Sequence, residues 1–164
     1  MILFFSILAI IGQVIIICLI FSSVIRRKIG NNALLFSFIV ALTATAGSLI
    51  FSEILKLEPC KLCWFQRIFM YPQVVLLGLA LFKKDKNIAS YSIALSIIGA
   101  IIAVYHYFLQ ISVVSKSFCS AIGYSASCTD TFAPIFGYIT IPMMSLTAFL
   151  MIISFLMTAP KRAS

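Results

Sequence analysis

Charged residues are scarce in this chain of 164 residues, where they make up 10% of the sequence while hydrophobic residues make up 63%. A soluble domain of this length cannot bury so much apolar side chain, so part of it must face lipid. The alternating pattern of a membrane β-barrel is also absent, because the apolar runs are continuous. Since unpaired backbone groups are not tolerated in hydrocarbon, the sequence predicts an all-α integral membrane protein.

Acidic residues are the scarcest charged class, with 4 Asp and Glu against 12 Lys and Arg and a net charge of +8. Such a charge is compatible with nucleic-acid binding, but the basic residues fall in short clusters between hydrophobic runs, which is typical of membrane orientation. We therefore expect no nucleic-acid partner. Internal repeats and low-complexity linkers are absent as well, and we expect a single membrane domain over residues 1–164.

Five apolar stretches are each about as long as the roughly 20 residues that a helix needs to cross a bilayer. They cover about Ile2–Ile25, Ala33–Leu55, Trp64–Phe82, Ile88–Ser112 and Gly137–Thr158. The first stretch lacks a preceding basic region and is too long for a signal peptide, so we expect it to be a retained helix. Pro72 and Pro142 fall inside the third and fifth spans, and both are expected to kink or locally open their helices.

The basic clusters predict how the spans are oriented. Eight of the 12 basic residues fall in the first connection, the third connection and the C-terminal tail. Because an excess of Lys and Arg marks the cytoplasmic side, we expect the N-terminus outside and the C-terminus in the cytoplasm. The outward loops are then about 56–63 and 113–136, and these two loops carry four of the five cysteines.

The first cysteine pair, Cys60 and Cys63, stands at the outer end of the third span. Pro59 suits the first position of a helix, and the spacing of three and four residues places Cys60, Cys63 and Arg67 on one stripe. The positive end of the helix dipole, with Lys61 and Arg67 nearby, predicts a reactive thiolate. Packing and a zinc site formed by all four cysteines are the alternatives. The outward compartment, where disulfides persist, favours a redox pair without metal.

The second pair, Cys119 and Cys128, lies in the long polar loop. Taken alone, this pair would indicate a structural disulfide. An accessible Cys-x-x-Cys on the same side of the membrane favours an exchangeable one, because exchange needs only access and an attacking thiolate. Cys18 lies in the middle of the first span without a cysteine partner in sequence, and we interpret it as a packing residue.

Polar residues near the outer ends of the spans are candidates for binding a redox cofactor. Arg67 either extends to the headgroup layer or holds a cofactor at the membrane surface, and Gln66 could bind the same ligand. His106 and Gln110 are four residues apart and share a helix face, and His106 is either a structural group or part of the site. Glu53 could pair with Arg67 or with Lys56 at the same end.

These features together resemble the membrane disulfide-bond formation proteins of the DsbB/BdbC type. The segments that carry the resemblance are Pro59–Arg67, His106 with Gln110, the loop with Cys119 and Cys128, and the BdbC-like stretch Phe136–Leu146. The resemblance covers roughly residues 33–158. It implies a four-helix redox bundle, here with one extra N-terminal transmembrane helix, in the bacterial cell (inner) membrane.

The resemblance also implies a relay of thiol–disulfide exchanges. A thioredoxin-like extracytoplasmic thiol oxidase would attack a Cys119–Cys128 disulfide at Cys119, and Cys128 would then exchange with Cys60 of a Cys60–Cys63 disulfide. Cys63 would pass the electrons to the membrane quinone pool, as ubiquinone or menaquinone. Arg67 would hold a quinone carbonyl, and His106 would help to position the ring or manage protons.

Three departures from the family pattern stand out: the extra first helix, the short spacing between the loop cysteines, and Gln66, which stands where the best-studied members have an acid. Two other classes remain as alternatives. A vitamin K epoxide reductase-like enzyme usually carries its loop cysteines before the Cys-x-x-Cys, whereas here they follow it. A small transporter, or a structural membrane protein with disulfide-stapled loops, should show paired broken helices or charges near mid-membrane, whereas here the charges lie at the span ends.

Overall fold

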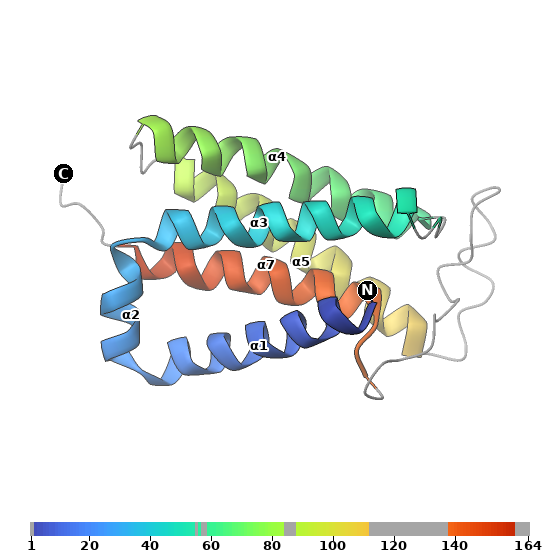
Figure 1. The fold of residues 1–164 in the computed structure, drawn as a ribbon, viewed down its shortest axis with the longest axis horizontal. Coiled ribbons are helices and arrows are strands. Elements are labelled where there is room, and N and C mark those ends of the chain that lie inside the picture. The colour runs from blue at the N-terminus through green and yellow to red at the C-terminus, as the bar shows by residue number, and fades with distance from the viewer. Residues whose placement is uncertain (1, 55, 57–58, 84–87, 112–137, 160–164) are drawn as a thin grey trace.

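The computed structural model describes residues 2–54, 56, 59–83, 88–111 and 138–159, and it is helical almost throughout (Figure 1). The helices are α1 (Ile2–Phe21), α2 (Ser23–Gly30), α3 (Ala33–Leu49), the π-helical turn η1 (Ile50–Ile54), α4 (Lys61–Lys83), α5 (Ile88–Ile111) and α7 (Ile141–Thr158). Five segments are long and apolar enough to cross a membrane, with η1 continuing α3 as one of them. The predicted all-α membrane fold with five spans is confirmed.

The first span is shorter than the predicted Ile2–Ile25, because the chain turns at Ser22 into α2. Helix ends leave carbonyl groups unpaired, and here Arg26 satisfies two of them. Its guanidinium donates to the carbonyls of Leu19, at 3.2 and 3.0 Å, and of Ile20, at 3.0 Å. Arg26 therefore caps the C-terminal end of α1.

The two prolines occupy different positions in their helices. Pro142 lies in the first turn of α7, because the helix begins at Ile141 rather than at Gly137. The N–H groups of a first helical turn have no partner within the helix, so a proline there costs no hydrogen bond. The prediction of a kink within the fifth span is therefore wrong at this position. Pro72 does lie inside α4, but the helix continues through it from Lys61 to Lys83.

The core of the bundle lies among α3, α4, α5 and α7. Phe149 of α7 is fully buried, and its ring lies so close to Gly99 of α5 that a Cβ at that position would overlap it. Gln73 of α4 is also buried, and its amide pairs with Ser92 and Ser96 of α5 at 2.8 Å each. Hydrogen-bonded polar groups of this kind hold helices together in lipid, where the burial of apolar side chains contributes little to helix association.

The extra helix α1 lies outside this four-helix core and packs mainly on α7. Figure 1 shows α1 and α7 running side by side, with α2 crossing from the end of α1 to the start of α3. The N-terminus, the start of α4 and the start of α7 lie at one end of the bundle, and α2 lies at the other. This arrangement separates the predicted outward segments from the basic cluster that begins at Arg26.

Candidate functional site

Cys60 lies at the N-cap of α4 rather than within the first helical turn. Its carbonyl accepts the backbone N–H of Trp64 at 3.1 Å, which is the first hydrogen bond of the helix, and Pro59 precedes the cap. The cap position turns the Cys60 side chain inward, where it is 6% exposed. Cys63 and Arg67 follow on the same side of α4, and all three line one cavity, so the predicted stripe is confirmed.

A directional chain of hydrogen bonds connects the two thiols with α5. Gln66 Nε2 lies 3.0 Å from His106 Nδ1, and His106 Nε2 lies 3.6 Å from Cys60 Sγ. When Gln66 donates its amide N–H to Nδ1, the other ring nitrogen, Nε2, is the one that can donate to Cys60. Cys60 in turn donates to Cys63 across 3.3 Å, a distance at which the sulfurs touch without a bond.

Cys60 stands one residue before the span Lys61–Lys83. The prediction that Cys60 is a thiolate is wrong for the reduced pair. The hydrogen bond to Cys63, followed by burial, raises the pKa of Cys60 from 9.0 to about 12, while His106 lowers it. The cation of Arg67 does not compensate, because its guanidinium is directed at the backbone of α3. Cys60 is therefore a thiol at neutral pH, with roughly one molecule in 10⁴ ionised at pH 8.

This raised pKa predicts an unusual pH dependence of alkylation. In the reduced protein, the labelling rate of Cys60 should still climb about tenfold per pH unit through pH 10, because only the thiolate reacts. In the denatured chain the rate should level off above about pH 9, close to the ordinary pKa of a thiol. Peptide mapping after timed labelling measures both rates. A plateau near pH 8 in the folded protein would contradict the raised pKa.

Arg67 is held at the edge of the site by α3 and by its own helix. Its Nη2 donates to the carbonyl of Ser48 at 3.1 Å, and the guanidinium carbon lies 5.5 Å from the centre of the Trp64 ring. Tyr71, one turn further along α4, donates to the Ser48 hydroxyl at 3.4 Å. Among the described residues, Ser48 is the only hydrogen-bond partner of the guanidinium, so further N–H groups remain for a ligand.

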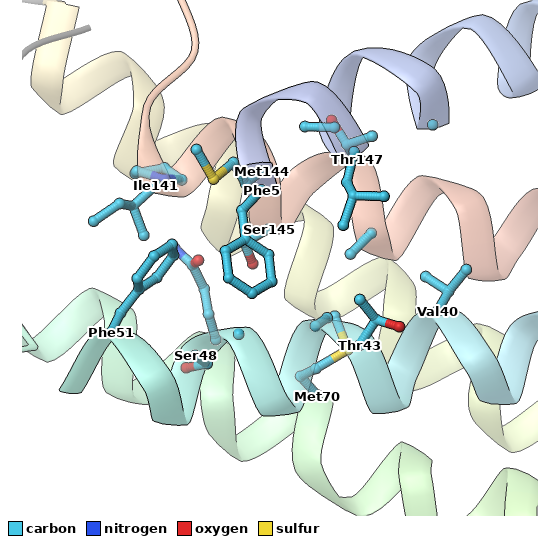
Figure 2. Close-up of a pocket in the computed structure, with 18 of the residues that line it drawn as sticks. Phe5, Val40, Thr43, Ser48, Phe51, Met70, Ile141, Met144, Ser145 and Thr147 are labelled. Carbon is cyan, nitrogen blue, oxygen red and sulfur yellow. The ribbon is translucent and has the colours of Figure 1, made fainter. Parts of the chain in front are cut away.

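A cavity of about 390 Å³ extends from the cysteine pair into the bundle, with walls from α1, α3, α4, α5 and α7. Figure 2 shows the cavity, with Phe5, Met70 and Met144 among the apolar side chains that line it. The end of the cavity near the cysteine pair also contains two polar atoms, Gln110 Oε1 and Thr140 Oγ1, that are buried and have no hydrogen-bond partner in the described part of the chain. Unpaired buried polar atoms are costly, and here they face a space that a polar ligand group could fill.

The same site could in principle hold a metal. The ligand atoms of Cys60, Cys63 and His106 all lie within 4.8 Å of one another. A closed structural zinc site needs a fourth ligand, and no other His, Cys, Asp or Glu joins this group within residues 2–54, 56, 59–83, 88–111 and 138–159. Two adjacent thiols beside a large apolar cavity fit redox chemistry better than a closed metal site.

The other predicted site residues fall into four groups. Gln110 and His106 both line the cavity, as their shared face predicts. Glu53 is exposed and forms no ion pair with either Arg67 or Lys56. Cys18 is exposed on the surface of α1 rather than packed, so the interpretation as a packing residue is wrong; a small apolar side chain can face lipid without a partner. Cys119 and Cys128, with the loop 113–136, lie outside the described residues.

The sequence does not indicate the contribution of α3 and α1 to the site. Ser48 anchors Arg67, and Gly47 beside it admits the Phe5 ring, whose nearest atom would lie 2.7 Å from a Cβ at Gly47. Tyr71 could have been found, because it continues the stripe of Cys63 and Arg67 at a spacing of four residues. The partners on α3 and α1 carry no such signal, because contacts between distant helices depend on how the helices pack.

Comparison with known proteins agrees with this geometry. The family described as disulfide bond formation protein DsbB matches residues 30–159. A probable disulfide formation protein C of Bacillus cereus is 48% identical over 127 residues, which are 77% of this chain and 91% of that protein. The disulfide bond formation protein C of Bacillus subtilis is 45% identical over 120 residues, which are 73% of this chain and 86% of that protein.

No solved structure matches the chain. The family match includes α3 to α7 and therefore Cys60, Cys63, His106 and Arg67, whereas all of α1 and all but the last residue of α2 precede it. The vitamin K epoxide reductase-like, transporter and structural alternatives are not supported by these matches. The chain is a multi-pass membrane protein that belongs to the DsbB family of disulfide bond formation proteins.

Proposed function

We propose that this protein reoxidises a thioredoxin-like extracytoplasmic thiol oxidase and passes the electrons to membrane quinone. The observation that carries the proposal is the contact between the buried Cys60–Cys63 pair and a largely apolar cavity inside the bundle. In the net reaction a dithiol of the partner becomes a disulfide, and quinone takes up two electrons and two protons to become quinol. Disulfide formation in the membrane is the role of the family. That quinone accepts the electrons and that the partner is a thioredoxin-like oxidase is what we propose here.

The raised pKa of Cys60 supports a particular order of exchange. When a thiolate attacks the Cys60–Cys63 disulfide, one sulfur forms the new bond and the other leaves with the electron pair. The better thiolate leaves more easily. Attack on Cys63 would expel Cys60, whose pKa of about 12 disfavours the thiolate. Attack on Cys60 instead leaves the pair of electrons on Cys63, which lines the cavity.

The attacking thiol is proposed to be Cys128, after the partner has opened a Cys119–Cys128 disulfide. Cys60 is buried, so a thiol tethered to the same chain has an advantage over one from bulk solution, because tethering raises its effective concentration. The exchange forms a Cys60–Cys128 bond and breaks the Cys60–Cys63 bond. The second thiol of the partner then attacks the partner's mixed disulfide with Cys119, which releases the oxidised partner and frees Cys119. Cys119 attacks the Cys60–Cys128 bond at Cys128, which re-forms Cys119–Cys128 and leaves Cys60 and Cys63 as the reduced pair that gives two electrons to quinone.

The residues around the cavity fit a quinone. Arg67 offers guanidinium donors, Gln110 and Thr140 offer buried polar atoms without partners, and the remaining wall is mostly apolar. When bound, a quinone supplies a two-electron acceptor. His106 is proposed to act as a positioning residue for Cys60 and to hold the proton on Nε2, and Gln66 to fix the imidazole through Nδ1.

The proposed orientation places the cysteine pair on the outer face, with the N-terminus outside and the C-terminus in the cytoplasm. Arg26, Arg27 and Lys83 lie at the opposite end of the bundle from Cys60, as the alternation of the spans requires. An excess of Lys and Arg on that side supports a cytoplasmic location for it.

Quinone reduction by the purified full-length protein tests the proposal. With a reduced thioredoxin-like protein as electron donor, we expect turnover with a benzoquinone or a naphthoquinone, and none when the donor is omitted. A chelator added to the assay should leave turnover unchanged, because no metal takes part. Absence of turnover with several donors and both quinone classes would contradict the proposed function and favour cysteines that only staple the protein.

A further inference from the structure

The helix α1 contributes a large part of the cavity wall, although it lies almost entirely before the residues that match the family. Six residues of α1 between Phe5 and Ile15 line the cavity. They cover about 15 Å of helix at 1.5 Å per residue. A helix that was added only as a membrane anchor would have no reason to form one side of a redox cavity.

The docking of α1 on α7 is specific. Gly12 lies so close to α7 that a Cβ there would be 2.6 Å from Met151 Sδ and 3.1 Å from Thr147 Cγ2. The next residue, Gln13, donates to Thr147 Oγ1 at 3.3 Å and accepts a hydrogen bond from the Tyr138 hydroxyl at 3.0 Å. Small residues and polar pairs of this kind fix the register of helices in lipid.

The side of α1 that faces α3 is different, because there the cavity separates the two helices. Phe5 crosses this gap: its ring packs edge-on against Phe51, with centroids 5.2 Å apart, and covers the surface of Gly47. Figure 2 shows the Phe5 ring extending from α1 into the cavity toward α3. Phe5 is therefore a wall residue of the cavity as well as a contact between helices.

The shape and polarity of the cavity indicate what kind of molecule it holds. On α3 and η1 the lining runs from Ile39 to Phe51, about 18 Å of helix. Polar groups gather at the end with Arg67, whereas Ile15 and Ile39 lie toward the other end. A ligand with a polar head and an elongated apolar tail matches this division, and a compact polar ligand does not.

We propose that α1 is a specificity element for the quinone tail: it closes the cavity between α3 and α7 and holds the first part of an isoprenoid chain. The inference rests on the proposed function, which supplies the quinone head at the cysteine end. The extra helix then discriminates between a quinone with an isoprenoid tail and the same quinone ring without a tail. Phe5 is the residue of α1 on which this discrimination depends most.

The test compares ligand binding by Phe5→Ala with binding by Phe21→Ala, a matched change on the same helix at an 85% exposed side chain that does not line the cavity. Binding is measured on the oxidised full-length protein with a benzoquinone and a naphthoquinone, each with and without an isoprenoid tail. We expect Phe5→Ala to weaken binding of the tailed quinone about tenfold, or ~1.4 kcal/mol. Binding of the tail-less ring should change less than twofold, and Phe21→Ala should change neither.

A second variant, Gly12→Leu, separates α1 from α7 and should weaken tailed-quinone binding further, with helicity and thermal unfolding measured to confirm the fold. Equal effects of Phe5→Ala on tailed and tail-less quinones, or no effect on either, would overturn the role of α1 and leave the proposed function intact. Phospholipid that co-purifies in a Phe5-dependent manner, while quinone binding does not depend on Phe5, would also overturn it. Wild-type protein that binds neither quinone class would overturn the proposed function and this inference together.

Discussion

Replacement of Cys63 by Ala should abolish electron transfer to quinone, with a loss of at least about 10³-fold, as is usual when the group that carries the chemistry is removed. The physical reason is the position of Cys63. It contacts Cys60 at 3.3 Å and lines the cavity, so it is the sulfur that can connect the disulfide with an acceptor in the bundle. Without it, Cys60 has no partner thiol on α4 with which to re-form a disulfide.

The measurement is quinone reduction driven by a reduced thioredoxin-like donor, with Cys18→Ala as the matched control. Cys18 is a cysteine in a membrane span that is exposed and lies away from the site, so its replacement should leave the rate within about twofold, as surface changes usually do. The Cys63→Ala protein should also accumulate the mixed disulfide between the donor and Cys119, which mass mapping detects, because Cys60 without Cys63 offers no disulfide for Cys128 to attack. Near-normal turnover of Cys63→Ala would show that the pair on α4 does not carry the electrons.

Replacement of Arg67 by Gln should lower turnover about 10²-fold, because a preorganised donor that faces developing negative charge is worth this much in a water-excluded site. Arg67 is positioned by Ser48 and by the Trp64 ring, so its cation is held at the cysteine end of the cavity without an acidic partner among the described residues. Arg67→Lys should recover only part of the rate, since an ammonium lacks the planar set of donors.

Lys61→Gln is the matched control for the Arg67 variants, because it removes one positive charge from the same helix but at a residue that does not line the cavity. Its turnover should stay within about twofold of wild type. The rate should be followed over a range of quinone concentrations, so that weaker binding and slower chemistry are separated. Equal losses in Lys61→Gln and Arg67→Gln would indicate a general effect of surface charge and contradict a specific role for Arg67.

Much of this protein can be predicted from its sequence, because the physics involved is local. The membrane class and the five spans follow from continuous apolar runs of about the bilayer length. The stripe of Cys60, Cys63 and Arg67 follows from helical spacing alone, as does the shared face of His106 and Gln110. These features depend on residues that are near one another in the chain, so no knowledge of packing is needed.

The tertiary structure decided what depends on contacts between distant segments. The sequence predicts a thiolate at Cys60 from the helix dipole and nearby cations, whereas the fold buries Cys60 against Cys63 and raises its pKa. Ser48 as the anchor of Arg67 and Phe5 as part of the cavity wall are likewise products of packing. The spacing of residues in the sequence determines which side chains share a helix face. Burial and contacts between helices have no period in the sequence, so only the packed bundle determines what that face contacts.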